Sequence, residues 1–374
     1  MVLVVGVSLA ACSSVAPKPT ATTSSPKAIS ISVHAYVYAQ YAIPQSFGGR
    51  GVLGRSGISA GSFGILLAVA GSNVPGNLVE VSAASKQFNV LKRAPVGAYP
   101  TVVSADSGSA WVLNSAMPGP GVLPQADSGT VFQFNRGLNI IYRYRLPTTS
   151  ATGHYGNPFA MVSSGATAWV VYSGPSLRIM ALNDGRESYL DSLPKINWDT
   201  SVSDSPSTVA LCNSRLWLAT STYLGAGSTK LYEIDLSNGH LVRQLTVPGS
   251  GEIHLACAPS GVLVAGDRGA LYLASSNGAV EISPPAKVSG GGWVNVTSAV
   301  VIGSVIWASC QVGAEGHELV AYNLRPPHQV LGKVNLGSGP QAGVSDLVAD
   351  GNTLIGLSSS PFNLVIIRTV INVS

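Results

Sequence analysis

One motif returns along this chain at regular intervals, and it constrains the fold more than any other feature. In each copy a short apolar strand leads through a turn into a second apolar strand that carries a large side chain at a fixed place. The four clearest copies carry a tryptophan there: Trp111, Trp169, Trp217 and Trp307. These tryptophans are 58 (169 − 111), 48 (217 − 169) and 90 (307 − 217) positions apart, and the last interval is twice 45. The intervals predict a structural repeat of about 45 residues.

Three further copies complete a set of seven, with an aliphatic residue in the tryptophan position: Leu67, Leu263 and Ile355. Most copies continue with a segment of the form apolar-x-x-apolar-Asn/Asp, as at 131–135, 179–183, 231–235 and 319–323. Asp-Gly or Asn-Gly turns follow at 183–185, 237–239 and 276–278, and they supply the positive φ that tight hairpins need. A fourth segment, often ending at proline, closes the copy. Each repeat therefore predicts four antiparallel strands.

Four strands in about 45 residues is the period of a β-propeller blade. A sheet that is apolar on both faces buries both of them only between two neighbours, and a ring gives every sheet two neighbours. We therefore predict an all-β fold, one seven-bladed β-propeller of four-stranded antiparallel blades, with the tryptophans as core between blades. A β-sandwich does not need seven copies of one motif, and a β-helix has shorter coils. The expected blades are 57–100, 101–150, 151–200, 201–251, 252–290, 291–341 and 342–374.

The ends of the chain predict how the ring closes. The last blade has three clear strands, 343–349, 352–358 and 363–370, and too few residues follow for a fourth. Residues 29–44 precede the first blade, and their aromatic run ending at Pro44 is typical of a fourth strand in this chain. We therefore expect this segment to be the outermost strand of the last blade, where it covers an edge that otherwise invites aggregation.

The first residues form an apolar run that ends at Leu9-Ala10-Ala11-Cys12 and is too short to span a bilayer. The run resembles the lipobox of bacterial lipoproteins, although no Lys or Arg precedes it. The resemblance implies cleavage before Cys12, lipidation of its thiol and an exported protein anchored to the cell membrane and facing outward. The alternative is an ordinary secretory signal with a chance cysteine. The domain prediction is a signal peptide over 1–12, a Ser/Thr/Pro-rich tether over 13–28 and the propeller over 29–374.

Two stretches of the repeat, 99–115 and 339–359, resemble the NHL, YVTN and virginiamycin B lyase group of propellers. That resemblance implies the fold but not the function, because propellers of this kind include enzymes, sensors and scaffolds. The pattern Ser104-x-Asp106-x-Gly108 before Trp111 also resembles the Asp-box of sialidases. Here we interpret it as a turn in which Asp106 accepts backbone N–H bonds.

Candidate binding residues gather in the segments that lead into the innermost strands, where propellers commonly hold ligands. The predicted site consists of Tyr99, His154, Tyr155, Glu252, His254, Trp293 and Asn295, with Asn157, Asp204 and Gln341 in the same segments. These polar and aromatic side chains suit a small polar molecule, a glycan or a peptide of a protein partner. Alternatively, they line a water-filled channel without binding anything.

Glu252-x-His254 is the sharpest pair, because alternate residues of a strand share a side. It resembles a Glu-x-His in virginiamycin B lyase, which implies lyase chemistry beside bound magnesium. The preceding blade lacks the histidine that would be the partner in acid–base catalysis, and offers Ser205, Ser207 and Thr208 instead. The leading hypothesis is therefore a non-enzymatic binding or scaffolding module. A lyase or hydrolase at the channel mouth is the alternative.

Other chemistry is weakly indicated. The six histidines show no ligand spacing on one strand, so no metal or other cofactor is expected. The charged residues, 10% of the chain, include no basic patch interleaved with aromatics except 142–145, which fits an outer strand, so no nucleic-acid partner is expected.

Cys212 and Cys257 lie in inner strands of adjacent blades. They either pair in an exported protein or stay as buried free thiols, and the state of Cys310 is open as well.

Overall fold

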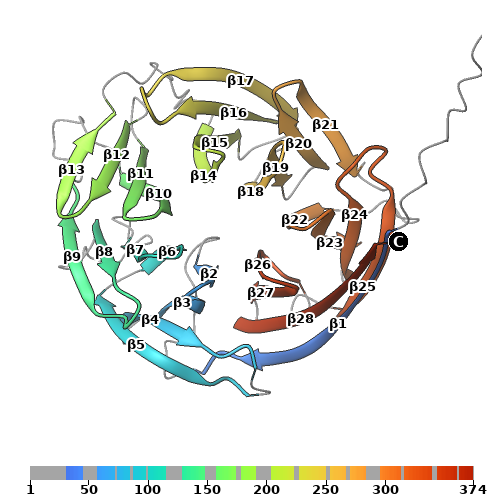
Figure 1. Ribbon diagram of the computed structural model, residues 1–374, viewed down its shortest axis with the longest axis horizontal. Helices are drawn as coiled ribbons and strands as arrows, with labels where there is room; N and C mark the ends of the chain where they lie inside the picture. Colours follow the sequence, from blue (N-terminus) through green and yellow to red (C-terminus); the bar gives the residue numbers. More distant parts are fainter. Residues whose placement is uncertain are drawn as a thin grey trace, which may run out of the picture.

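The computed structural model describes residues 31–44, 57–71, 74–84, 87–97, 100–114, 129–147, 157–173, 178–190, 204–222, 227–249, 253–266, 270–283, 295–312, 316–338, 343–359 and 362–373. Every helix or strand within these ranges is a β-strand, and the strands form seven four-stranded antiparallel sheets. No helix in the described part of the chain is long and apolar enough to cross a membrane. The predicted all-β, seven-bladed ring is confirmed, and Figure 1 shows its seven sheets around a common centre.

Each sheet is one blade. The first two blades contain β2 (Ile58–Gly61), β3 (Gly64–Gly71), β4 (Val74–Val81) and β5 (Val90–Gly97), then β6 (Pro100–Ala105), β7 (Ala110–Asn114), β8 (Thr130–Phe134) and β9 (Ile140–Arg145). The third and fourth contain β10 (Asn157–Ser164), β11 (Thr167–Ser173), β12 (Arg178–Asn183) and β13 (Arg186–Tyr189), then β14 (Asp204–Cys212), β15 (Arg215–Thr222), β16 (Ser228–Asp235) and β17 (Leu241–Pro248). The fifth and sixth contain β18 (Ile253–Ala258), β19 (Gly261–Gly266), β20 (Leu271–Ser275) and β21 (Gly278–Ser283), then β22 (Asn295–Ile302), β23 (Val305–Val312), β24 (Gly316–Asn323) and β25 (Val330–Ser338). The seventh contains β26 (Asp346–Asp350), β27 (Thr353–Ser359), β28 (Phe362–Val373) and β1 (Ile31–Ala42).

Seven clusters of buried apolar side chains hold the ring together, and each lies between two adjacent blades. Side chains alternate across each strand, so one blade contributes to the clusters on both of its sides. Trp111, Trp217 and Trp307 are at most 3% exposed and pack in the cluster shared with the following blade. The prediction that the repeated tryptophans are core between blades is confirmed for these three.

In the first blade the tryptophan position belongs to Leu66 and not to the predicted Leu67. Leu66 packs in the cluster shared with the second blade, whereas Leu67 packs in the cluster shared with the seventh. Leu66 pairs with Ser59 and Trp111 pairs with Ser104, each seven positions earlier, so the two side chains occupy the same place in their hairpins and are 45 residues apart (111 − 66). Counting residues across loops of unequal length misplaced this side chain by one position, which moves it to the opposite face.

The N-terminal strand closes the ring as predicted. β1 pairs antiparallel with β28 along its whole length, from Ile31 opposite Val373 to Ala42 opposite Asn363. Figure 1 shows β1 at the rim of the ring beside β28. The last residues of the chain, which were expected to be too few for another strand, extend β28 and thereby lengthen this pairing.

Cys212 and Cys257 form a disulfide between the fourth and fifth blades, with their Cα atoms 5.3 Å apart. The sequence left this pairing open because the two residues are out of alignment by one position in the repeat. This offset of one position allows the two cysteines to meet. Adjacent blades present opposite faces of their sheets to the interface they share, so residues that face each other across it differ by an odd number of positions in the repeat. Cys310 is free and buried.

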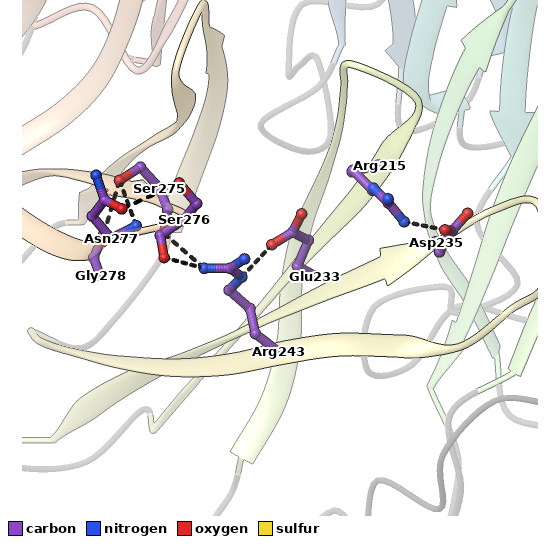
Figure 2. A network of polar contacts seen from close by, with 8 residues as sticks. All are labelled: Arg215, Glu233, Asp235, Arg243, Ser275, Ser276, Asn277 and Gly278. Atoms are coloured by element: carbon purple, nitrogen blue, oxygen red, sulfur yellow. Dashed lines mark hydrogen bonds and ion pairs between the residues drawn. The ribbon is translucent and has the colours of Figure 1, made fainter.

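Polar contacts add ties between blades. Arg243 in β17 places Nε 2.6 Å from Glu233 Oε2 and donates from Nη1 to the carbonyl oxygens of Ser275 and Ser276, at 3.2 and 2.7 Å, in the fifth blade (Figure 2). Lys92 makes the same type of contact between the first and second blades. In both cases a cationic side chain forms an ion pair with a carboxylate of its own blade and donates hydrogen bonds to backbone carbonyl oxygens at a turn of the next blade.

The Asp-box segment is a turn, as interpreted from the sequence. Asp106 Oδ1 accepts hydrogen bonds from the N–H groups of Gly108 and Ser109, at 2.9 and 3.4 Å. Its other oxygen accepts from the N–H of Gly165 in the third blade. Nearby, the hydroxyl oxygens of Ser104 and Ser163 are 2.9 Å apart. The motif therefore joins two blades on the face where their innermost strands end.

Candidate functional site

The face of the ring on which the innermost strands begin is called here the channel-mouth face. In the sequence the predicted binding residues precede or begin innermost strands: β6 begins directly after Tyr99, β18 directly after Glu252 and β22 at Asn295. Five of the seven predicted residues lie outside the described residues, as does Gln341: Tyr99, His154, Tyr155, Glu252 and Trp293. Their role as a site stays a prediction.

The two described members of the predicted site are both half-buried. His254 is the second residue of β18, opposite Ala265, and its Nδ1 atom is buried. Asn295 is the first residue of β22, opposite Gln311. Because Glu252 lies outside the described residues, the Glu252–His254 pair is not tested. Within the described ranges no group of three or more His, Cys, Asp or Glu residues could hold a metal ion.

A cavity of about 450 Å³, which the sequence analysis did not anticipate, lies between the third and fourth blades. Its walls come from the ends of β10, β14 and β16 and the turns after β14 and β16, so it opens on the face opposite the channel mouth. The lining residues are Ser163, Ser164, Trp169, Leu211, Asn213, Ser214, Asp235, Leu236 and Ser237. We call this cavity the blade 3–4 pocket. Its volume falls within the range of about 300–1,000 Å³ that is usual for small-molecule sites.

Trp169 is the exception among the repeated tryptophans that the structure describes. It stands in β11 at the position equivalent to Trp111, yet it is only partly buried and lines the blade 3–4 pocket. Among the described residues, the apolar cluster between these blades contains seven buried side chains, whereas each of the other clusters contains at least 11. Seven more apolar side chains of this cluster, Trp169 among them, are only partly buried, so part of the indole ring stays uncovered.

The charge in the blade 3–4 pocket is balanced. Asp235 at the end of β16 forms an ion pair with Arg215 at the start of β15 (Figure 2). Asp235 Oδ1 also accepts hydrogen bonds from the Ser237 hydroxyl and N–H, at 2.7 and 2.9 Å. The Ser237 hydrogen bonds, together with the neighbouring Arg215, lower the pKa of Asp235 below its ordinary value. The carboxylate is therefore ionised at neutral pH and already faces a cation of the protein.

The turn between β14 and β15 gives the pocket an unusual wall. Asn213 and Ser214 both adopt positive φ, at 52° and 62°, a conformation that residues other than glycine take infrequently. The equivalent turns of the third, sixth and seventh blades place Gly165, Gly303 and Gly351 at positive φ. The fourth blade thus carries the amide side chain of Asn213 where these three blades carry a glycine, and both Asn213 and the following Ser214 line the pocket.

No protein-family model matches this sequence, and no curated protein matches it either. Solved structures match it in fold. The β-propeller domain of Cps50 (Swd1) from Myceliophteria thermophila has a TM-score of 0.58 and 11% identity, over 84% of this chain and 96% of that one. The Pan2 WD40 domain of Neurospora crassa has a TM-score of 0.60 and 11% identity, over 89% of this chain and 95% of that one. At such identities the likeness shows the fold alone, and the fold defines this chain as a seven-bladed β-propeller.

Proposed function

We propose that this protein is an exported, lipid-anchored β-propeller of the NHL and YVTN type that acts as a binding or scaffolding module. Its ligand or partner would bind at the channel-mouth face, near Tyr99, His154, Tyr155, Glu252, His254, Trp293 and Asn295. The observation that carries the proposal is a closed ring of seven blades whose polar and aromatic loop residues are concentrated before the innermost strands. The ring fixes the ends of those loops on one face, which is the usual arrangement of binding residues on a rigid scaffold.

Two features support the exported location. The Leu9-Ala10-Ala11-Cys12 sequence is followed by a Ser/Thr/Pro-rich segment that suits a tether between a membrane surface and a folded domain. The disulfide between Cys212 and Cys257 supports the same location, because disulfides persist in oxidising compartments outside the cytosol. An anchored ring on a tether would present its binding face to molecules outside the cell membrane.

Replacing the proposed lipidated cysteine tests the anchor. The Cys12→Ala variant is expected to leave the membrane fraction, because it has no thiol to carry a lipid. Cell fractionation and metabolic labelling with a fatty acid measure this, with Cys310→Ala as a control that keeps both the label and the membrane location. Failure of the wild-type protein to incorporate the fatty acid would contradict the proposal.

Substitutions on the channel-mouth face test the binding role. We expect a ligand found by thermal-shift screening of polar small molecules, peptides and glycans to bind at least about ten-fold more weakly to His254→Ala and Trp293→Ala variants, since a lost buried contact costs about 1.4 kcal/mol or more. The control is Val330→Ala on the exposed rim, where Val330 is 53% exposed. Unchanged affinity in the channel-mouth variants would move the site elsewhere. Turnover of the ligand that depends on Glu252 would instead support a lyase or hydrolase.

A further inference from the structure

We propose that the blade 3–4 pocket is a second binding site, specific for a neutral saccharide. It lies on the face opposite the channel mouth, so it goes beyond the proposed function and does not depend on it. Three properties of the pocket lead to this ligand class: a partly uncovered indole ring, a wall of short polar side chains and a balanced charge.

The indole of Trp169 supplies the flat apolar surface. Sugar rings present patches of C–H groups on their faces and hydroxyl groups around their edges, so they bind best where an aromatic face adjoins polar groups. Trp111, Trp217 and Trp307 stand at equivalent positions but are covered by the following blade. Trp169 alone among these four combines the same rigid placement in a second strand with an uncovered surface in a cavity.

Short polar side chains of the pocket supply hydrogen-bonding groups at low entropic cost. Ser164 and Ser214 carry hydroxyl groups that both donate and accept. The Ser237 hydroxyl donates to Asp235 and can still accept, and Asn213, whose Nδ2 donates to the carbonyl oxygen of Pro259 at 3.4 Å, can accept through Oδ1. Short side chains lose little rotamer freedom when a ligand orders them. The Asn213–Ser214 turn holds the backbone of these two residues at positive φ.

The ion pair selects against charged ligands. A Trp beside an Asp is also the chemistry of a site for organic cations. Here Asp235 already pairs with Arg215, and Ser237 donates twice to the same carboxylate. A cation would have to compete with Arg215, whereas a sugar hydroxyl can donate to a remaining lone pair without breaking the pair. The pocket therefore fits a neutral polyhydroxylated ligand.

The test uses the purified full-length protein and isothermal titration calorimetry with glucose, N-acetylglucosamine, maltose and chitobiose, and with tetramethylammonium as a cationic probe. At least one sugar is expected to bind, and tetramethylammonium is not. Trp169→Ala should weaken sugar binding at least about ten-fold. Ser214→Gly should weaken it about two- to ten-fold, the effect of one hydrogen bond, without lowering the melting temperature, because glycine tolerates the positive φ.

Matched controls separate this site from the channel-mouth face. Tyr189→Ala removes an exposed aromatic ring from the same blade, and His254→Ala alters the other face; both should bind the sugar like the wild type. Absence of binding for all four sugars would overturn the inference, as would sugar binding that survives Trp169→Ala or binding of tetramethylammonium in the pocket. Sugar binding that survives Trp169→Ala but is lost in His254→Ala would place the sugar at the channel-mouth face, whereas absence of sugar binding leaves the channel-mouth proposal standing.

Discussion

Deleting residues 29–44 is expected to abolish cooperative folding of the ring, whereas deleting 13–28 is expected to leave its stability unchanged. Loss of β1 removes the fourth strand of the last blade and exposes the edge of β28 along all its pairs. It also removes two buried side chains from the adjoining interfaces, since Val33 packs toward the sixth blade and Tyr41 toward the first. Thermal unfolding followed by circular dichroism measures the effect.

Point substitutions within β1 keep this prediction testable if the deleted chain aggregates. Tyr41 is 6% exposed, and Tyr41→Ala should lower the free energy of unfolding by about 3 kcal/mol, the usual cost of emptying a buried aromatic site. Tyr36 lies on the same strand but is 55% exposed, so Tyr36→Ala should change stability by only about 0.5 kcal/mol or less. Equal effects of the two substitutions would mean that β1 is not docked in this register.

Breaking the disulfide between the fourth and fifth blades is the second large effect that we expect. The bond joins residues 45 positions apart, and removing a crosslink of this length lowers the free energy of unfolding by about 2–4 kcal/mol. Cys257→Ser is the cleaner variant, because Cys257 is exposed whereas Cys212 is buried. Urea unfolding of the wild type and the variant, each with and without reductant, measures the loss.

Reductant provides the control for that comparison. Reduced wild-type protein and Cys257→Ser should unfold at about the same urea concentration, and reductant should not affect the variant. Peptide mapping under non-reducing conditions should recover a crosslinked pair of peptides that contain Cys212 and Cys257. Recovery of both cysteines as free thiols from exported protein would contradict the pairing.

The sequence predicted the ring because the repeated large side chain is a direct physical requirement of blade stacking. Each copy of the motif marks a second strand, and seven copies fix the number of blades. The closure of the ring could also be predicted from the sequence. The last blade lacked a fourth strand, and residues 29–44 carried the aromatic pattern of a fourth strand but belonged to no other blade. Both inferences depend on local sequence patterns within strands, which do not depend on the length or conformation of the loops.

Features that depend on how two blades face each other could not be predicted from the sequence. The Cys212–Cys257 pairing required knowing that adjacent blades present opposite faces, which an alignment of copies conceals. The blade 3–4 pocket required knowing how well neighbouring side chains fill one interface. Trp169 has the same local sequence pattern as Trp217, yet Trp169 is only partly buried in its interface whereas Trp217 is buried in the next one. A signal was nevertheless present at Asn213, where three other blades use glycine.

Trypsin treatment of the membrane-bound protein tests the central claim, an anchored tether followed by a ring that its own first strand closes. Lys18 precedes Pro19 and resists cleavage, so the cut within the tether falls after Lys27. The account predicts release of a soluble ring with the melting temperature of the intact protein, in which the peptide carrying residues 31–42 remains bound and is recovered by mass spectrometry. Release of a ring that has lost this peptide, or a ring that stays in the membrane after the cut at Lys27, would contradict the account.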